Sequence, residues 1–147
     1  MPGQRARRIA NEWAVLTDLG RAERRVEGDT DVFATTIRDA PALVGPGESL
    51  RIEREHDVVF RFPRFFPAMP VEVFVARPVF HPNVHPRTGF VCLWKEDDPG
   101  NSVADALVRL RWVISWRMFN ESPVHVMQEE AVRWYRSPGR AIAVPLR

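Results

Sequence analysis

A chain of 147 residues, 45% hydrophobic and 27% charged, has the length and composition of one globular domain that buries its own core. The net charge of +2 comes from arginines interspersed with acidic residues, which argues against a nucleic-acid partner, and a single cysteine excludes an intramolecular disulfide. Four histidines and one cysteine show no metal-ligand spacing, so we expect no metal and no cofactor. No secretory signal and no apolar stretch of about 20 residues is visible, which predicts a cytoplasmic protein without a membrane partner.

The first element expected is an amphipathic helix over residues 4–20. Ile9, Trp13 and Leu16 recur at helical spacing, and Gly20 is a typical stop. The other faces of this helix carry polar side chains: Arg5, Arg7, Arg8 and Glu12. Cations at a helix start oppose the helix dipole, so a partner surface explains the three arginines better than a stabilising role does.

Extended segments follow this helix. Strands are predicted at 23–27, 32–38, 58–62 and 71–76, which together make a four-stranded antiparallel meander, with a further short strand at 50–55. The proline- and glycine-rich stretch Ala40–Gly47 is expected to be a loop.

The next segment, Arg77–Asn101, lacks a periodic pattern and holds the only cysteine, Cys92. Long irregular segments inside compact domains are usually functional. Cys92 follows Asn83 by nine residues. A thiolate supplies a nucleophile and an Asn amide supplies a donor for a developing oxyanion, which suggests covalent thiol chemistry. The alternative is a small buried cysteine that only fills the core.

A buried helix is expected after this segment. Ser102 and Asp105 have the spacing of a capping box that opens a helix. An apolar stripe, widened by Trp112 and Trp116, predicts that the helix is largely buried and continues until Pro123.

The C-terminal part is expected to hold one more helix, over residues 126–136, and a short tail over residues 137–147. The order of the elements predicts an α+β fold with a single domain over residues 1–136.

The motif around the cysteine resembles the active site of the ubiquitin-conjugating enzymes. It consists of His81-Pro82-Asn83, a turn at Gly89 and Val91-Cys92-Leu93. The resemblance covers about residues 5–136 and includes further segments in the family's order: Phe60–Pro63, Phe66–Val75, Asn120–Val124 and Glu129–Tyr135. It implies that family's fold, with an N-terminal helix, a four-stranded antiparallel meander, an active-site loop segment and C-terminal helices.

The same resemblance implies a thioester-forming enzyme. An activating enzyme would pass a ubiquitin-like protein to Cys92, and an acceptor amine or a second thiol would then attack the thioester. Asn83 would donate to the oxyanion or order the active-site loop, although it lies nine residues from Cys92 where the family pattern has eight. Ser122, with Glu121 as the alternative, would orient or desolvate the incoming amine.

The histidines carry different expectations. His81 and Pro82 are structural members of the motif in this family. His85 is absent from the family pattern and is the better candidate for chemistry, whereas His56 and His125 are expected at the surface.

The resemblance also implies partners: a ubiquitin-like protein, its activating enzyme and an acceptor protein. In the family the first helix docks the activating enzyme, here through Arg5, Arg7 and Arg8. Ala68 and Lys95–Gly100 replace the family's ligase-contact residues, which argues against a typical RING ligase. The shortened tail, the arginine-rich composition and the altered loops resemble divergent bacterial conjugating enzymes, some of them tied to antiphage defence.

Two other functions stay open. One is a non-catalytic module of the same fold that only binds a ubiquitin-like protein, and the other is an unrelated α+β domain with a buried cysteine. Cys92 at its motif position favours the enzyme. Lys95, the only lysine, lies three residues from Cys92 and, with the N-terminal amine, is the expected site of self-modification.

Overall fold

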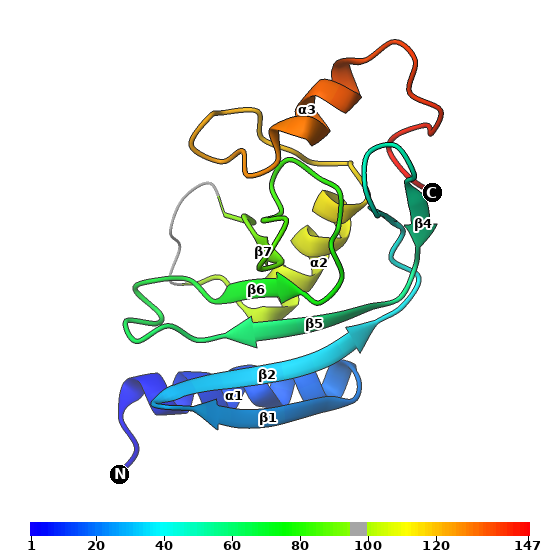
Figure 1. The fold of residues 1–147 in the computed structure, drawn as a ribbon. Helices are drawn as coiled ribbons and strands as arrows, with labels where there is room; N and C mark the ends of the chain where they lie inside the picture. Colours follow the sequence, from blue (N-terminus) through cyan, green and yellow to red (C-terminus); the bar gives the residue numbers. More distant parts are fainter. Residues whose placement is uncertain (95–99) are drawn as a thin grey trace.

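A five-stranded antiparallel sheet forms the centre of the molecule (Figure 1). The computed structural model describes residues 1–94 and 100–147. The strands lie in the order β1 (Ala22–Glu27), β2 (Thr30–Ile37), β5 (His56–Arg61), β6 (Glu72–Val75) and β7 (Phe90–Val91). The helices of the described part are α1 (Gln4–Leu19), α2 (Val103–Ile114) and α3 (Glu129–Arg136). The predicted α+β fold, with its N-terminal helix, meander and C-terminal helices, is confirmed.

A small second sheet was not expected. Strand β3 (Ala42–Val44) pairs antiparallel with β4 (Arg51–Glu53), so the prediction of a loop throughout Ala40–Gly47 was wrong. All three residues of β3 are buried, at 1% exposure or less, and Val44 also bridges to Val79. A run of three apolar residues between Pro41 and Gly45 is too short to show alternation in the sequence, yet burial decides its conformation.

Strand β7 brings the cysteine segment onto the sheet. Its two residues pair with β6, inside a segment predicted to lack regular structure. The chain reaches this position through a turn at Gly89, where φ is +76° and a β-carbon would clash with the carbonyl oxygen of Val75. Only glycine fits such a close approach with a positive φ. Gly89 therefore fixes where Cys92 leaves the sheet.

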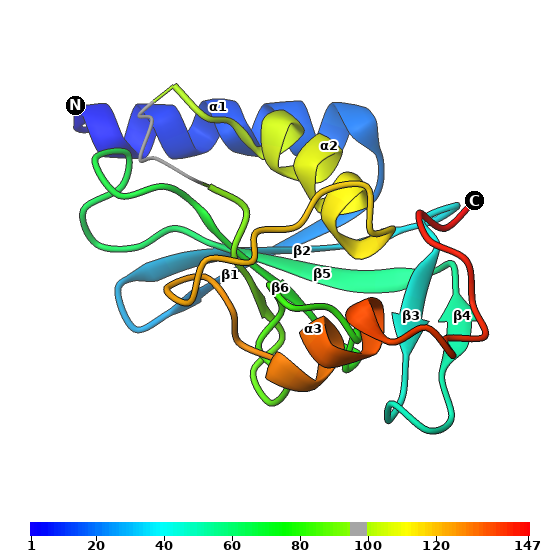
Figure 2. The same cartoon turned by 90° about the horizontal axis from the view of Figure 1, so that it is seen from above.

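The main core lies between the sheet and two helices. Figure 2 shows α1 and α2 on the same side of the sheet, and residues of both pack onto it. Ile9 and Leu16 from α1 and Leu110 from α2 are buried, at 2% exposure or less, against strand residues such as Phe33 and Phe60. The apolar residues that recur at helical spacing therefore form the face of each helix that contacts the sheet, as the sequence predicted.

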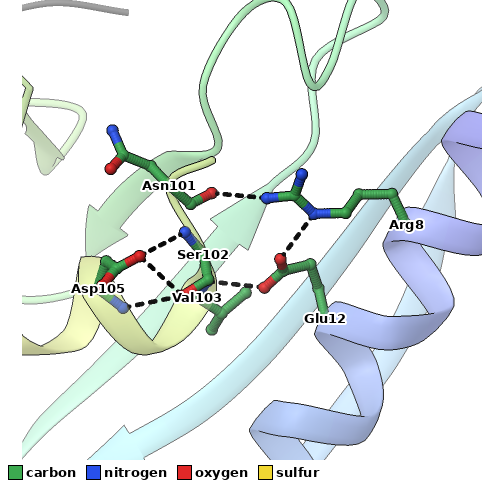
Figure 3. A network of polar contacts seen from close by, with 6 residues as sticks. All are labelled: Arg8, Glu12, Asn101, Ser102, Val103 and Asp105. Atoms are coloured by element: carbon green, nitrogen blue, oxygen red, sulfur yellow. Dashed lines mark hydrogen bonds and ion pairs between the residues drawn. The ribbon is translucent and has the colours of Figure 1, made fainter. Parts of the chain in front are cut away.

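One polar residue of α1 faces this core, against expectation. Glu12 is only 4% exposed. Figure 3 shows its carboxylate at the start of α2, where Oε2 accepts from the N–H of Val103 at 2.8 Å and Oε1 accepts from Arg8 Nε at 3.0 Å. Ser102 and Asp105 form the predicted capping box beside it. Glu12 thus satisfies a helix-end donor that would otherwise be buried without a partner.

Helix α2 ends earlier than predicted, at Ile114 rather than before Pro123. Trp116 has a φ of +65°, which a helix cannot continue through. After this turn the Trp116 side chain no longer follows the helix, and Trp116 Nε1 donates to the carbonyl of Phe80 at 3.2 Å. Trp112, expected in the core, is 46% exposed instead.

A second, smaller core surrounds Trp116. We call it the aromatic cluster, and its aromatic members are Phe80, Trp116, Phe119, Trp134 and Tyr135. The Trp116 and Tyr135 rings are stacked with centroids 5.6 Å apart. Residues 137–147, expected to be a short tail, pack onto this cluster through Leu146, whose N–H donates to the carbonyl of Ser115 at 2.8 Å. No helix in the described part of the chain is long and apolar enough to cross a membrane.

Candidate active site

Cys92 lies directly after β7 and faces a cavity of about 310 Å³. The thiol is half-buried. Its backbone N–H donates to the carbonyl of Asn83 at 2.9 Å, which places the two motif residues side by side. A larger cavity of about 540 Å³, lined by Val59, Phe74 and Gly89 among others, shares no lining residue with the Cys92 cavity. The smaller cavity is the one that contains the thiol.

Asn83 forms hydrogen bonds with the chain segment opposite the cysteine. We call residues 119–128, which connect the end of the α2 region to α3, the His125 loop. Asn83 is 2% exposed, and its Nδ2 donates to the carbonyls of Asn120 at 2.9 Å and His125 at 3.0 Å. Its Oδ1 accepts from the N–H of Asn120 at 2.7 Å. Both amide hydrogens are engaged, which is the arrangement of a residue that orders the loop.

Pro82 contacts the same loop, and His81 contacts Met118, the residue directly before it. The Nδ1 of His81 accepts from the N–H of Asn83 at 3.0 Å, so its Nε2–H donates to the carbonyl of Met118 at 3.2 Å. The Pro82 carbonyl accepts from the N–H of Met127 at 2.7 Å. Burial lowers the pKa of His81 to about 3, so this ring stays neutral and does not act as a base.

His125 is the residue that sequence reasoning missed. It was expected at the surface, yet it is half-buried and its Nδ1 lies 3.2 Å from Cys92 Sγ. Burial raises the pKa of the Cys92 thiol. The two residues are 33 positions apart, and no periodicity links them. The usable signal was adjacency, because His125 directly follows the segment Asn120–Val124 that resembles the family.

Ser122 shapes the loop through its backbone. Its N–H donates to Asn120 Oδ1 at 2.9 Å, and its carbonyl accepts from the N–H groups of His125 and Val126. Ser122 is exposed and is not among the residues that line the cavity. Glu121, the alternative, pairs with Arg136 of α3 at 3.2 Å. The role of either side chain toward an incoming amine stays a prediction.

The remaining histidines have local structural contacts. His85 Nδ1 accepts from the N–H groups of Arg87 at 3.2 Å and Thr88 at 3.1 Å, which shapes the turn before β7. His56, expected at the surface, is 1% exposed, and its Nε2 lies 3.0 Å from the carbonyl oxygen of Ala40. Burial lowers the pKa of His56.

The arginines at the start of α1 differ from one another. Arg5 donates to the carbonyls of Phe62 at 3.1 Å and Pro63 at 3.2 Å, and Arg8 binds Glu12. The premise that these two side chains have no stabilising role was therefore wrong. Arg7 is exposed and donates to the carbonyl of its near neighbour Pro2. Docking of an activating enzyme by Arg5, Arg7 and Arg8 stays a prediction, with Arg7 as its most accessible member.

Two further expectations concern the segment after Cys92 and metal binding. Lys95 and most of the segment Lys95–Gly100 lie outside the described residues. Within the described ranges, no group of three or more His, Cys, Asp or Glu side chains is arranged to hold a metal ion.

Comparisons with known proteins agree with this architecture. No protein-family model and no curated protein matches the chain. A crystal structure described as that of a ubiquitin-conjugating enzyme from Plasmodium yoelii matches 94% of this chain and 87% of its own, with a TM-score of 0.61 and 16% identity. The ubiquitin-conjugating enzyme E2 UbcA1 from Agrocybe aegerita matches 92% of this chain and 96% of its own, with a TM-score of 0.52 and 19% identity. The chain therefore has the fold of the ubiquitin-conjugating enzymes.

Proposed function

We propose that this protein is a conjugating enzyme for a ubiquitin-like protein, which it carries as a thioester on Cys92. The observation that carries the proposal is the placement of Cys92. The thiol faces a cavity at the end of β7, and His81-Pro82-Asn83 holds the opposite wall of that cavity in place. The fold of the two similar solved structures supports the same reaction class.

The chemistry is a transfer between thiols followed by a transfer to an acceptor. The Cys92 sulfur attacks the carbonyl carbon of a donor thioester, a new S–C bond forms, and the donor sulfur leaves with a proton. Cysteine suits such a carrier because sulfur is both a good nucleophile and a good leaving group. The second step consumes the Cys92 thioester when the acceptor, an amine in the simplest case, attacks the same carbon.

The partners follow from the reaction. A ubiquitin-like protein, its activating enzyme and an acceptor protein are required, and all three would be met in the cytoplasm. The divergence at Ala68 favours an interaction that does not use a typical RING ligase. We also propose a bacterial source and a role in antiphage defence, on the resemblance of the altered loops alone.

The test is a charging assay. The protein is mixed with ATP, a ubiquitin-like protein and its activating enzyme, and the products are separated without reductant. A band that thiol removes is expected for the native protein. Cys92→Ser should give a thiol-resistant ester, and Cys92→Ala should give no band.

A module that only binds the ubiquitin-like protein would give a complex in solution without any covalent band. An undiminished covalent band in the Cys92→Ala variant would place the chemistry on another residue. Circular dichroism of both variants serves as the control for folding.

A further inference from the structure

The Cys92 cavity contains one side chain with a ring nitrogen that can accept a proton. Among the described residues that line it, His125 is the only histidine, and none is a carboxylate. His125 Nδ1 lies within hydrogen-bonding distance of the sulfur, at 3.2 Å. Arg117, on the segment after α2, is the cation of the lining, while the carboxylate of nearby Glu121 pairs with Arg136.

The position of His125 depends on its backbone rather than its ring. Its N–H donates to the carbonyl of Ser122 at 2.8 Å, and its carbonyl accepts from Asn83 Nδ2 at 3.0 Å. A substitution of the ring therefore leaves both backbone bonds of the His125 loop intact. The contribution of the imidazole can be separated from that of the loop.

The lining also distinguishes between acceptor groups. A lysine amine has an ordinary pKa of about 10.4 and arrives as an ammonium ion, which the like charge of Arg117 disfavours. A hydroxyl group arrives neutral, so Arg117 does not oppose it. Because a hydroxyl is a poor nucleophile until it loses its proton, it needs a base within reach as it attacks. The imidazole of His125 meets this need.

We propose, on the basis of the proposed function, that His125 is the general base of the reaction at Cys92 and that it allows transfer to a hydroxyl group in addition to an amine. The hydroxyl oxygen attacks the thioester carbonyl carbon, a C–O bond forms, and the hydroxyl proton moves to His125 Nδ1. The C–S bond then breaks, and the Cys92 sulfur leaves and takes the proton back from His125. The products are an ester and the free thiol, so no further reactant is needed.

The test loads Cys92 chemically, with an acetyl-glycyl-glycine thioester, so that it needs neither an activating enzyme nor a ubiquitin-like protein. The loaded protein is offered N-acetylthreonine amide or N-acetyllysine amide, and ester and amide products are quantified by mass spectrometry. Cys92→Ala, which cannot be loaded, gives the background.

The test variant is His125→Asn, because an Asn Oδ1 accepts the thiol hydrogen bond but does not take up the proton. His85→Asn is the matched control. His85 Nδ1 accepts from two backbone N–H groups in a turn that does not line the cavity, and an Asn Oδ1 preserves this role. Near-ultraviolet circular dichroism checks that both variants keep their packing.

We expect ester from the native protein and from His85→Asn. The His125→Asn variant should form ester at least about 100-fold more slowly, the lower end of the usual contribution of a general base. The decrease in the rate of amide formation that His125→Asn causes should be smaller at alkaline pH, where more of the amine is already unprotonated. Unchanged ester formation in His125→Asn, or no ester from the loaded native protein, would overturn the inference. If the protein is never charged by an activating enzyme but gives His125-dependent ester from the small thioester, the inference stands and the proposed function fails.

Discussion

The two cores of this molecule are built in different ways. In the main core, regular hydrogen-bond ladders hold the strands together, and α1 and α2 pack onto this sheet through apolar faces with a clear period. The aromatic cluster joins loops, α3 and the C-terminal residues through individual contacts, such as Trp116 Nε1 to the Phe80 carbonyl. Cys92 is positioned by the first region and His125 by the second. The comparison teaches that the two sides of the site depend on separate sets of residues.

The strongest way to break this comparison is to remove Trp116. Its side chain is 3% exposed at the centre of the aromatic cluster, and truncation of a buried tryptophan costs about 3–5 kcal/mol. We expect Trp116→Ala to lower the free energy of unfolding in urea by that amount. It should also slow the reaction of Cys92 with the small thioester, because Trp116 packs 4.8 Å from the His81 ring.

Leu110→Ala is the comparison from the main core, with a cost of about 2–5 kcal/mol. In conditions where this variant is still folded, its Cys92 should react normally. Trp112→Ala, at 46% exposure, should change stability by less than about 0.5 kcal/mol. Equal thiol reactivity in the Trp116 and Leu110 variants would show that the two cores are not separate.

Asn83→Ala tests the contact between the two regions. It leaves the N–H of Asn120 and two loop carbonyls without their partner, which costs about 1–3 kcal/mol. We expect charging and discharge of Cys92 to fall together, because the variant loses the position of His125. A loss confined to discharge, measured in single-turnover assays, would instead favour Asn83 as the oxyanion donor. Asn83→Asp should be no more stable than Asn83→Ala, because its second carboxylate oxygen would face the carbonyls of Asn120 and His125.

The pH dependence of stability sharpens the comparison. His81 has a folded pKa of about 3, whereas an unfolded histidine titrates near 6.5, so its contribution is complete above about pH 6.5 and is lost as the pH falls toward 3. The expected slope is up to about 1.4 kcal/mol per pH unit for this proton. Urea unfolding of the native protein and of His81→Gln between pH 6.5 and 4 measures it. His56, whose pKa burial also lowers, keeps part of the slope in the variant, and identical slopes would contradict a buried neutral His81.

The smallest stability effect is expected at the exposed end of α1. Arg7→Glu should change the free energy of unfolding by less than about 0.5 kcal/mol, whereas Arg5→Glu should destabilise more because Arg5 binds two carbonyls of the sheet region. If α1 docks an activating enzyme, Arg7→Glu should slow charging, with a strong dependence on salt. Arg7→Gln is the control for loss of charge without reversal. Unchanged charging rates at low salt would remove Arg7 from the interface.

Sequence reasoning succeeded where a physical signal extends over several residues. The periods of α1 and the meander, and the capping box of α2, each predicted the observed element. It failed at β3, which is three buried residues long, and at Trp116, whose positive φ ends α2 without a proline or glycine. Local patterns carry no information on such features, because tertiary burial decides them.

The site divides in the same way. The resemblance around Cys92 led to Asn83, His81 and Pro82, which the structure brings together. His125 was missed because it meets Cys92 only through the folded chain, across 33 positions. Glu12 was misassigned for a related reason, since its partner Val103 lies 91 positions away and makes a buried carboxylate acceptable. Polar residues at long-range contacts are therefore where sequence and structure disagree.

The hydrogen bonds of Asn83 have a kinetic consequence. They close a loop between residues 37 and 42 positions apart, so the His125 loop can open locally while the sheet remains folded. Every 1.4 kcal/mol of opening free energy changes the open fraction about tenfold. Asn83 Oδ1 accepts from the Asn120 amide and so protects it from exchange. The hydrogen-exchange rate of this amide therefore measures the fraction of molecules in which the His125 loop is open and His125 no longer contacts the thiol. Any macromolecule that binds the closed His125 loop raises the fraction of molecules whose thiol contacts His125, without touching either side chain.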